Sequence, residues 1–378
     1  MKKMDGAIAG LIVDEYGTDE FMIRLSDPYW FQAFGCALGF DWHSSGVTTT
    51  VCGALKAALK KEDLGIYAAR GKGNTGKDTL SEIETDASGR LSEAKIHKLR
   101  YASRISAKVD SSLVQDGYDL HHHFFMYDNN GKWAVVQQGM NANNLYARRY
   151  HWLKDSVYDF VEEPHRAICC NASSEILNVS AKESKGARDI SLDLVRDNCL
   201  SRFSFQQRNL LEFMGQRPSI LTMKKEHWIR DFDLTHRDRE VLKRAYEYQP
   251  ESFEEMLSLD GFGKKKIRAL ALVSDLIYGS PASARDPVTG KFSVRFLYTV
   301  GGKDGTPEPV NAEVYDTTID FLRNALGNAR LGEKDKITAL QRLNSYVCSS
   351  SSYQDTPEVL RQSSPLDHQQ KEGHSPLS

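Results

Sequence analysis

The chain has 378 residues, of which 40% are hydrophobic and 26% charged, as is usual for a globular protein of two or three domains. Its formal net charge of −2 excludes a basic field over the whole molecule, so any affinity for nucleic acid must come from local patches. The sequence has no apolar run long enough to span a membrane and no recognisable signal peptide, so we expect a cytoplasmic protein.

The first part of the chain predicts a mixture of helix and strand, and we therefore expect an α+β fold. Hydrophobic periodicity and turn residues define its first predicted elements, which are a helix at residues 47–60 and strands at 103–109, 122–127 and 133–138. Asn130 and Gly131 lie between the last two strands, and this pair is a strong signal for a β-hairpin.

Changes in composition, together with proline and glycine residues that end helices, divide the chain into four expected segments. They are a catalytic α+β domain at residues 1–168, a helical domain at 169–282, a small β-α segment at 283–346 and a tail at 347–378. The β-α segment predicts a strand at 292–300 and a helix at 315–325. The tail lacks apolar periodicity, so we expect it to be disordered.

Residues 253–279 of the helical domain have the pattern of a helix-hairpin-helix, a module that binds the phosphates of DNA. A short helix precedes a hairpin with two glycines, and three lysines begin the second helix. Glycine permits positive φ and close approach of the backbone, while the free N–H groups of a helix N-terminus attract anions. The residues predicted to contact DNA here are Gly261, Phe262, Gly263, Lys264, Lys265 and Lys266. The alternative is an ordinary turn between surface helices with solvated lysines.

A second signal is a group of titratable and polar residues on the predicted strands. Side chains alternate along a strand, so His122 and His123 must point to opposite faces. One histidine, Gln137 and Asp110 from a neighbouring strand are expected to share a face. Such a set suits Mg²⁺ or Mn²⁺ better than structural zinc, and the predicted metal ligands are Asp110 and His123.

Alternatively, a histidine acts as general base while Lys108 or Arg149 stabilises negative charge. The predicted catalytic set is Asp110, His122, His123, Gln137, Lys108, His43 and His151. Arg148 and Arg149 are expected to bind phosphate. A hydrogen-bonded polar core without function explains the same residues and stays open.

The loop at residues 71–77 is rich in glycine and lysine but lacks the P-loop pattern, because Asp78 follows Lys77 and no clear strand precedes it. We expect a flexible basic loop, not a nucleotide triphosphate site.

Several long segments resemble a family of archaeal and bacterial proteins catalogued as a domain of unknown function. They run through nearly the whole chain except its tail, and include FGCALGFDWHSSGVTTTVCGALK, AKVDSSLVQDGYDLHHHFFMYD, WAVVQQGMN, ARRYHW, EEPH and LSLDGFGKKKIRALALVSDLIYG. The resemblance implies an intracellular prokaryotic protein with a helix-hairpin-helix, and it carries no assigned mechanism. The matching positions we nominate are His43, Asp110, Gln115, Asp116, His122, His123, Gln137, Gln138 and His151.

Together these features predict a DNA nuclease or DNA-processing phosphodiesterase. It would hold DNA by its phosphates, without sequence preference, and two copies in a homodimer would strengthen the grip. A non-catalytic DNA-binding or repair scaffold is the alternative. A third possibility is an enzyme that acts on a small nucleotide or a nucleic-acid adduct.

Overall fold

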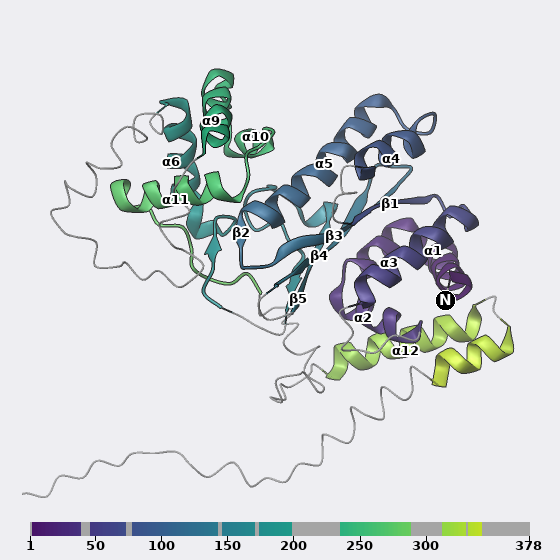
Figure 1. Cartoon of the computed structure of the whole chain (residues 1–378). Coiled ribbons are helices and arrows are strands. Elements are labelled where there is room, and N and C mark those ends of the chain that lie inside the picture. The colour runs from purple at the N-terminus through teal and green to yellow at the C-terminus, as the bar shows by residue number, and fades with distance from the viewer. Residues whose placement is uncertain are drawn as a thin grey trace, which may run out of the picture.

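The computed structural model describes residues 2–38, 46–72, 78–142, 146–170, 174–198, 235–288, 312–329 and 332–341. The fold is α+β, as expected, with helices on both faces of an antiparallel sheet (Figure 1). The helices are α1 Lys2–Leu25, α2 Pro28–Ala37, α3 Val47–Glu62, α4 Asp78–Ala87, α5 Glu93–Ser112, α6 Lys185–Arg196, α9 His236–Tyr248, α10 Phe253–Ser258, α11 Lys264–Tyr278 and α12 Ala312–Asn328. The described ranges also contain two short 3₁₀ turns, η2 Lys154–Ser156 and η3 Lys182–Ser184, and helical residues at 333–341.

Within the described residues the main sheet has five strands in the order β1-β3-β4-β5-β6, and neighbouring strands are antiparallel. Its strands are β1 Ile66–Lys72, β3 Asp119–Asp128, β4 Trp133–Met140, β5 Ala147–Leu153 and β6 Ala167–Cys169. A small second sheet pairs β2 Val114–Gln115 with β7 Leu177–Asn178. The predicted strands at 122–127 and 133–138 are confirmed as parts of β3 and β4. Gly131 turns between them with φ +79°, as the Asn-Gly signal predicts.

The predicted strand at 103–109 is wrong, because these residues lie in the long helix α5. Ile96, Leu99, Ala102, Ile105 and Val109 are all buried, and their spacing of three or four residues gives one helical face. Ser92 begins the helix by accepting a hydrogen bond from a backbone N–H of its first turn. Asp110 therefore comes from a helix that covers the sheet, not from a neighbouring strand.

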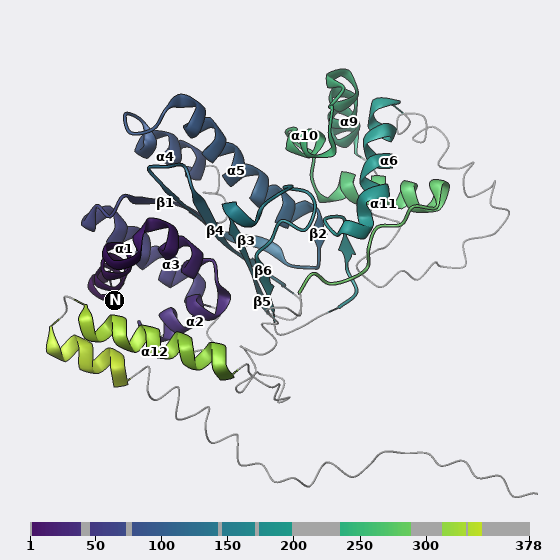
Figure 2. The same cartoon turned by 180° about the vertical axis from the view of Figure 1, so that it is seen from behind.

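Alternation along the strands produces two hydrophobic cores, one on each face of the sheet. The first core lies between the sheet and α1, α2, α3 and α12, and contains Phe124 and Val136. The second lies between the sheet and α5, with α6, α9, α10 and α11 beside it, and contains Phe125 and Val135. Figure 2 shows the two helical groups on opposite sides of the strands.

The helical elements after β6 form one cluster at an end of the sheet. α6 packs against α9, α10 and α11, and both α10 and α11 also contact α5. The second core thus contains residues from both sides of the predicted boundary at 168. The catalytic and helical segments expected from the sequence therefore share one core.

Other expectations have mixed outcomes. The helix predicted at 47–60 is α3, although Gly46 occupies its N-cap position without a side-chain cap. The helix predicted at 315–325 is part of α12. A strand does precede the glycine-rich loop, because β1 ends at Lys72, and α4 follows it. Residues 73–77, the predicted strand at 292–300 and the tail at 347–378 lie outside the described residues. None of the described helices is both long enough and apolar enough to cross a membrane.

Candidate functional site

The helix α5 carries Asp110 into the second core, where its carboxylate is 1% exposed and receives three hydrogen bonds. The Nε2 of Gln137 and the Nε1 of Trp152 donate to Oδ2 at 2.5 and 3.1 Å. The Nε2 of His165 donates to Oδ1 at 2.5 Å. Burial raises the pKa of Asp110, and the neighbouring His165 and the hydrogen bonds from His165 and Trp152 oppose that rise.

The same Gln137 determines the state of His123, its partner in the β3–β4 register. Because the amide nitrogen of Gln137 donates to Asp110, its oxygen Oε1 faces Nδ1 of His123 at 2.9 Å. Nδ1 must then carry the imidazole proton, and Nε2 accepts from Oγ of Ser103 at 2.8 Å. Burial lowers the pKa of His123 to about 4, so the ring is neutral near pH 7. His123 and Gln137 thus share one face of the sheet, while Asp110 reaches them from helix α5 and not from the neighbouring strand that was expected.

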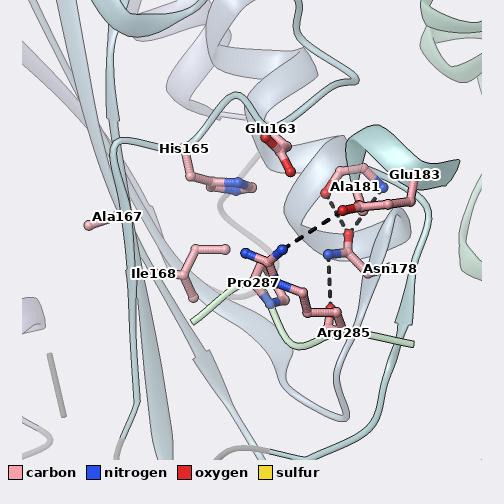
Figure 3. A pocket seen from close by; sticks show the side chains of 10 residues that line it. Glu163, His165, Ala167, Ile168, Asn178, Ala181, Glu183, Arg285 and Pro287 are labelled. Carbon is pink, nitrogen blue, oxygen red and sulfur yellow. Dashed lines mark hydrogen bonds and ion pairs between the residues drawn. The ribbon is translucent and has the colours of Figure 1, made fainter. Parts of the chain in front are cut away.

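His165 connects this buried network to a cavity of about 190 Å³. Its side chain is 7% exposed and lies against Trp152, with ring centroids 4.6 Å apart. One ring nitrogen is held by Asp110, and Figure 3 shows the ring pointing into the cavity. A carboxylate that fixes the tautomer and orientation of an imidazole leaves the other nitrogen able to accept a proton. This Asp110–His165 pair, which we call the dyad, is the part of the network best placed for chemistry.

The opposite face of the sheet carries the other predicted residues. His122 is paired in register with Gln138, which is paired with Arg149. The guanidinium of Arg149 donates through Nε to Nε2 of His151 at 2.9 Å and through both Nη atoms to Oε1 of Gln32 at 3.2 Å. Burial and the charge of Arg149 hold the pKa of His151 well below its usual range. His122 and His151 therefore lie on the face away from the dyad, and the predicted His43 is outside the described residues.

A direct metal site formed by Asp110 and His123 does not fit this geometry. Both carboxylate oxygens and both ring nitrogens already have hydrogen-bond partners, and the Gln137 amide lies between the two side chains. In the part of the chain that the structure describes, no group of three or more His, Cys, Asp or Glu residues is arranged to hold a metal ion.

Arg148 and Asp116 form a buried ion-pair cluster beside the dyad. Nη1 of Arg148 donates to Oδ2 of Asp116 at 2.8 Å, and Nη2 donates to Oδ2 of Asp286 at 2.9 Å. The hydroxyl of Tyr150 also donates to Asp116, at 2.8 Å. Arg148 is 1% exposed, so it holds residue 286 against the sheet and does not offer its charge to phosphate. The nominated Gln115 donates to the first backbone carbonyl of α11 at 2.9 Å.

The three lysines at the start of α11 have different environments. Lys266 is 6% exposed and forms an ion pair with Asp238, so it is not available to DNA. Lys264 is exposed and lies 2.7 Å from Asp119, which is itself exposed. Lys265 is also exposed. Two of the three lysines expected to contact DNA are therefore exposed at this position.

Lys108 fixes the hairpin to α5. Its amine donates to the carbonyl of Leu257 at 2.6 Å and to that of Leu259, where α10 ends. Burial, reinforced by the charge of Arg104, lowers the pKa of Lys108 to about 8. Lys108, which was expected to stabilise negative charge, thus contacts two carbonyls at the C-terminal end of α10.

A comparison with protein-family models supplies the relationship of this chain to other proteins. A model described as "Protein of unknown function (DUF763)" matches residues 1–310. The chain belongs to this family. None of the curated proteins and none of the solved structures searched matches the chain.

Sequence reasoning missed three members of the network. His165 occurs in the family segment EEPH but lies between elements, where no strand or helix pattern indicates its direction. Ser103 falls in the predicted strand at 103–109 and not on the buried face of a helix, and Trp152 lies in the segment ARRYHW without a predicted role. The partners of these three side chains are 20 to 55 residues away in sequence, which local patterns do not reveal.

Proposed function

We propose that the protein binds DNA through the hairpin Leu259–Gly263 and the N-terminus of α11. The observation that carries this proposal is the open backbone at Gly263, the N-cap residue of α11. No side chain caps this helix end, and a Cβ built on Gly263 would have nothing within 4 Å. A phosphate can therefore approach the backbone N–H groups directly, where the helix dipole favours an anion.

The exposed lysines support the same proposal. Lys265 extends from the first turn of α11, and Lys264 is held only by a solvent-exposed ion pair with Asp119. Such exposed pairs contribute about 0–1 kcal/mol, so a DNA phosphate can replace the carboxylate. Contacts of this kind carry no base preference, and binding should weaken strongly as salt rises. We propose a homodimer because two such hairpins on one DNA molecule would bind it more tightly than one hairpin does.

We further propose that the dyad gives the protein a hydrolytic activity on bound DNA. Asp110 orients His165, and the second ring nitrogen of His165 can take a proton from a water molecule as that water attacks. Phosphodiester cleavage, as by a nuclease, is the form that the sequence predicts, with Mg²⁺ or Mn²⁺ as an added cofactor. The buried position of His123 favours a supporting role for that residue instead of direct contact with substrate.

A non-catalytic DNA-binding scaffold is the second candidate. It is favoured by the fully hydrogen-bonded state of His123 and Gln137, which is what a polar core without function requires. In that case the dyad only stabilises the fold, and its removal should lower stability without changing any activity.

One experiment separates the two candidates. Purified protein is incubated with single-stranded, duplex and branched DNA, with and without Mg²⁺ or Mn²⁺, and both strand cleavage and base release are measured. The hydrolase proposal expects an activity that His165→Asn abolishes while DNA affinity is retained. If none of the substrates is altered, or if His165→Asn remains fully active, the scaffold is the better description.

A further inference from the structure

The cavity at His165 combines apolar walls with hydrogen-bonding groups. The side chain of Ile168 in β6 forms one wall, and Pro287 lies opposite (Figure 3). The polar lining comes from His165, Glu163, Asn178, Ser180, Glu183 and Arg285. At about 190 Å³ it is smaller than the roughly 300–1,000 Å³ of sites for whole drug-sized ligands, so it suits a single ring system.

In the absence of a divalent cation, the charges around this cavity do not favour a phosphate group. Glu163 and Glu183 bring two carboxylates, and the single guanidinium of Arg285 lies 3.8 Å from Glu183. An anion would gain one shared positive charge and meet two negative ones. A neutral group with both donors and acceptors can instead use the carboxylate of Glu163 and the free ring nitrogen of His165.

The cavity is connected to the DNA-binding hairpin by the small second sheet. Asn178, in the cavity wall, pairs with Val114 in the β2–β7 ladder. The next residue, Gln115, donates to the carbonyl of Lys264 and accepts from Arg268 of α11. The strand β2 therefore contacts both the cavity wall, through Val114 and Asn178, and the start of α11, through Gln115.

We propose that this cavity receives a single unpaired nucleobase from DNA that is held at the hairpin. The inference rests on the proposed DNA binding and adds to it the chemical group that the dyad meets. Enzymes that act on or inspect a base take it out of the stack, hold its faces between apolar side chains and bind its edge by hydrogen bonds. Ile168 and Pro287 provide the apolar contacts, and Glu163 and His165 provide the hydrogen bonds.

The test uses free deoxynucleosides, which have a base but no phosphate. The full-length protein, labelled with ¹⁵N in its histidine rings, is titrated with each deoxynucleoside and separately with inorganic phosphate. The proposal expects at least one deoxynucleoside to shift the ring signals of His165 at millimolar concentration, and expects phosphate not to do so. A shift with phosphate alone, or with no compound, overturns it.

Two substitutions locate the binding. Glu163→Gln keeps the shape of an exposed side chain but removes its charge, and should weaken deoxynucleoside binding about tenfold, since a hydrogen bond to a charged group contributes roughly 1.5–3 kcal/mol. Glu247→Gln, an exposed glutamate elsewhere on α9, is the matched control and should have no effect. Ile168→Phe should block binding by filling the cavity. Unchanged binding in Glu163→Gln overturns the assignment even if Ile168→Phe fails to fold.

Failure of this inference differs from failure of the DNA-binding proposal. Lys265→Ala should weaken binding of duplex DNA and leave deoxynucleoside binding unchanged, because Lys265 does not line the cavity. Glu163→Gln should leave binding of fully paired duplex unchanged. A protein that binds duplex DNA but no deoxynucleoside keeps the hairpin proposal and loses the nucleobase cavity.

Discussion

The two glycines of the hairpin give the sharpest test of DNA binding, because the change to alanine should destabilise the fold at Gly261 but not at Gly263. Gly261 has φ +82°, and a Cβ there would lie 2.7 Å from Cγ2 of Val241. Gly263 has φ −131° and ψ −172°, an extended conformation that alanine adopts without strain, and a Cβ there would meet nothing within 4 Å. Glycine permits positive φ at both positions, and of the two only Gly261 adopts it.

The expected magnitudes follow from these geometries. Gly261→Ala should lower the free energy of unfolding by about 1–2 kcal/mol through its left-handed backbone, and by more through the clash with Val241. Gly263→Ala should leave it nearly unchanged, because the gain of about 0.4–1 kcal/mol from the lower entropy of the unfolded chain is offset by the weaker preference of alanine for the N-cap position. If phosphate approaches the backbone at Gly263, the added methyl group should weaken DNA binding at least tenfold by removing a hydrogen bond worth roughly 1.5–3 kcal/mol.

The assay combines denaturant unfolding with fluorescence anisotropy of a labelled duplex at several salt concentrations. The decisive result is a Gly263→Ala protein that is about as stable as the wild type and binds DNA more weakly. Lost affinity then cannot be ascribed to unfolding. If Gly263→Ala binds DNA as well as the wild type does, the hairpin backbone does not contact phosphate and the reasoning is refuted.

Two other predictions concern charge. Lys265→Ala should reduce the slope of log affinity against log salt by about 0.9 without changing stability, whereas Lys266→Ala should leave the slope unchanged. Burial would raise the pKa of Asp238, but hydrogen bonds from Lys266 and Thr235 and the charge of Lys266 outweigh it and lower the pKa to about 2. Lys266→Ala removes only the part due to Lys266, so it should destabilise the fold by about 1–2 kcal/mol above pH 4, with the loss disappearing towards pH 2. His123, with a pKa lowered to about 4, should make stability fall by about 1.4 kcal/mol per pH unit from pH 6.5 towards pH 4. His123→Gln should remove that part of the slope in unfolding experiments, and an unchanged slope would contradict the buried neutral imidazole.

Local sequence patterns were sufficient where structure depends on neighbouring residues. Asn130 and Gly131 located the β3–β4 hairpin because its turn requires positive φ. Alternation then placed His122 and His123 on opposite faces, since a strand leaves no other arrangement. With that register, Gln137 opposite His123 followed directly.

The same methods failed where a short window was ambiguous. Ile105, Ala107 and Val109 alternate with polar residues, as in a strand, yet Ile96 and Leu99 extend the pattern with the longer spacing of a helix. Seven residues were too few to distinguish the two periods.

Contacts between residues far apart in the sequence could not be predicted from local sequence patterns. Nothing near Lys266 in the sequence indicates that Asp238, 28 residues earlier, neutralises it. His165 lies in a loop between secondary-structure elements. Neither the direction of its side chain nor its partner Asp110 could therefore be predicted from the periodicity of a helix or a strand. Both cases need the packing of separate elements.

The position of α5 explains why the hairpin and the dyad belong to one mechanism, if both proposals hold. Lys108 and Asp110 are two residues apart on this helix, so their side chains point about 200° apart around its axis. Lys108 therefore holds the carbonyls at the hairpin while Asp110 reaches the sheet and orients His165. Because one rigid helix makes both contacts, DNA bound at the hairpin is held at a fixed position relative to His165. This coupling requires no conformational change. Lys108→Met removes the amine but keeps the aliphatic part of the side chain. It should weaken hydrolysis and DNA binding together while leaving deoxynucleoside binding at the cavity intact.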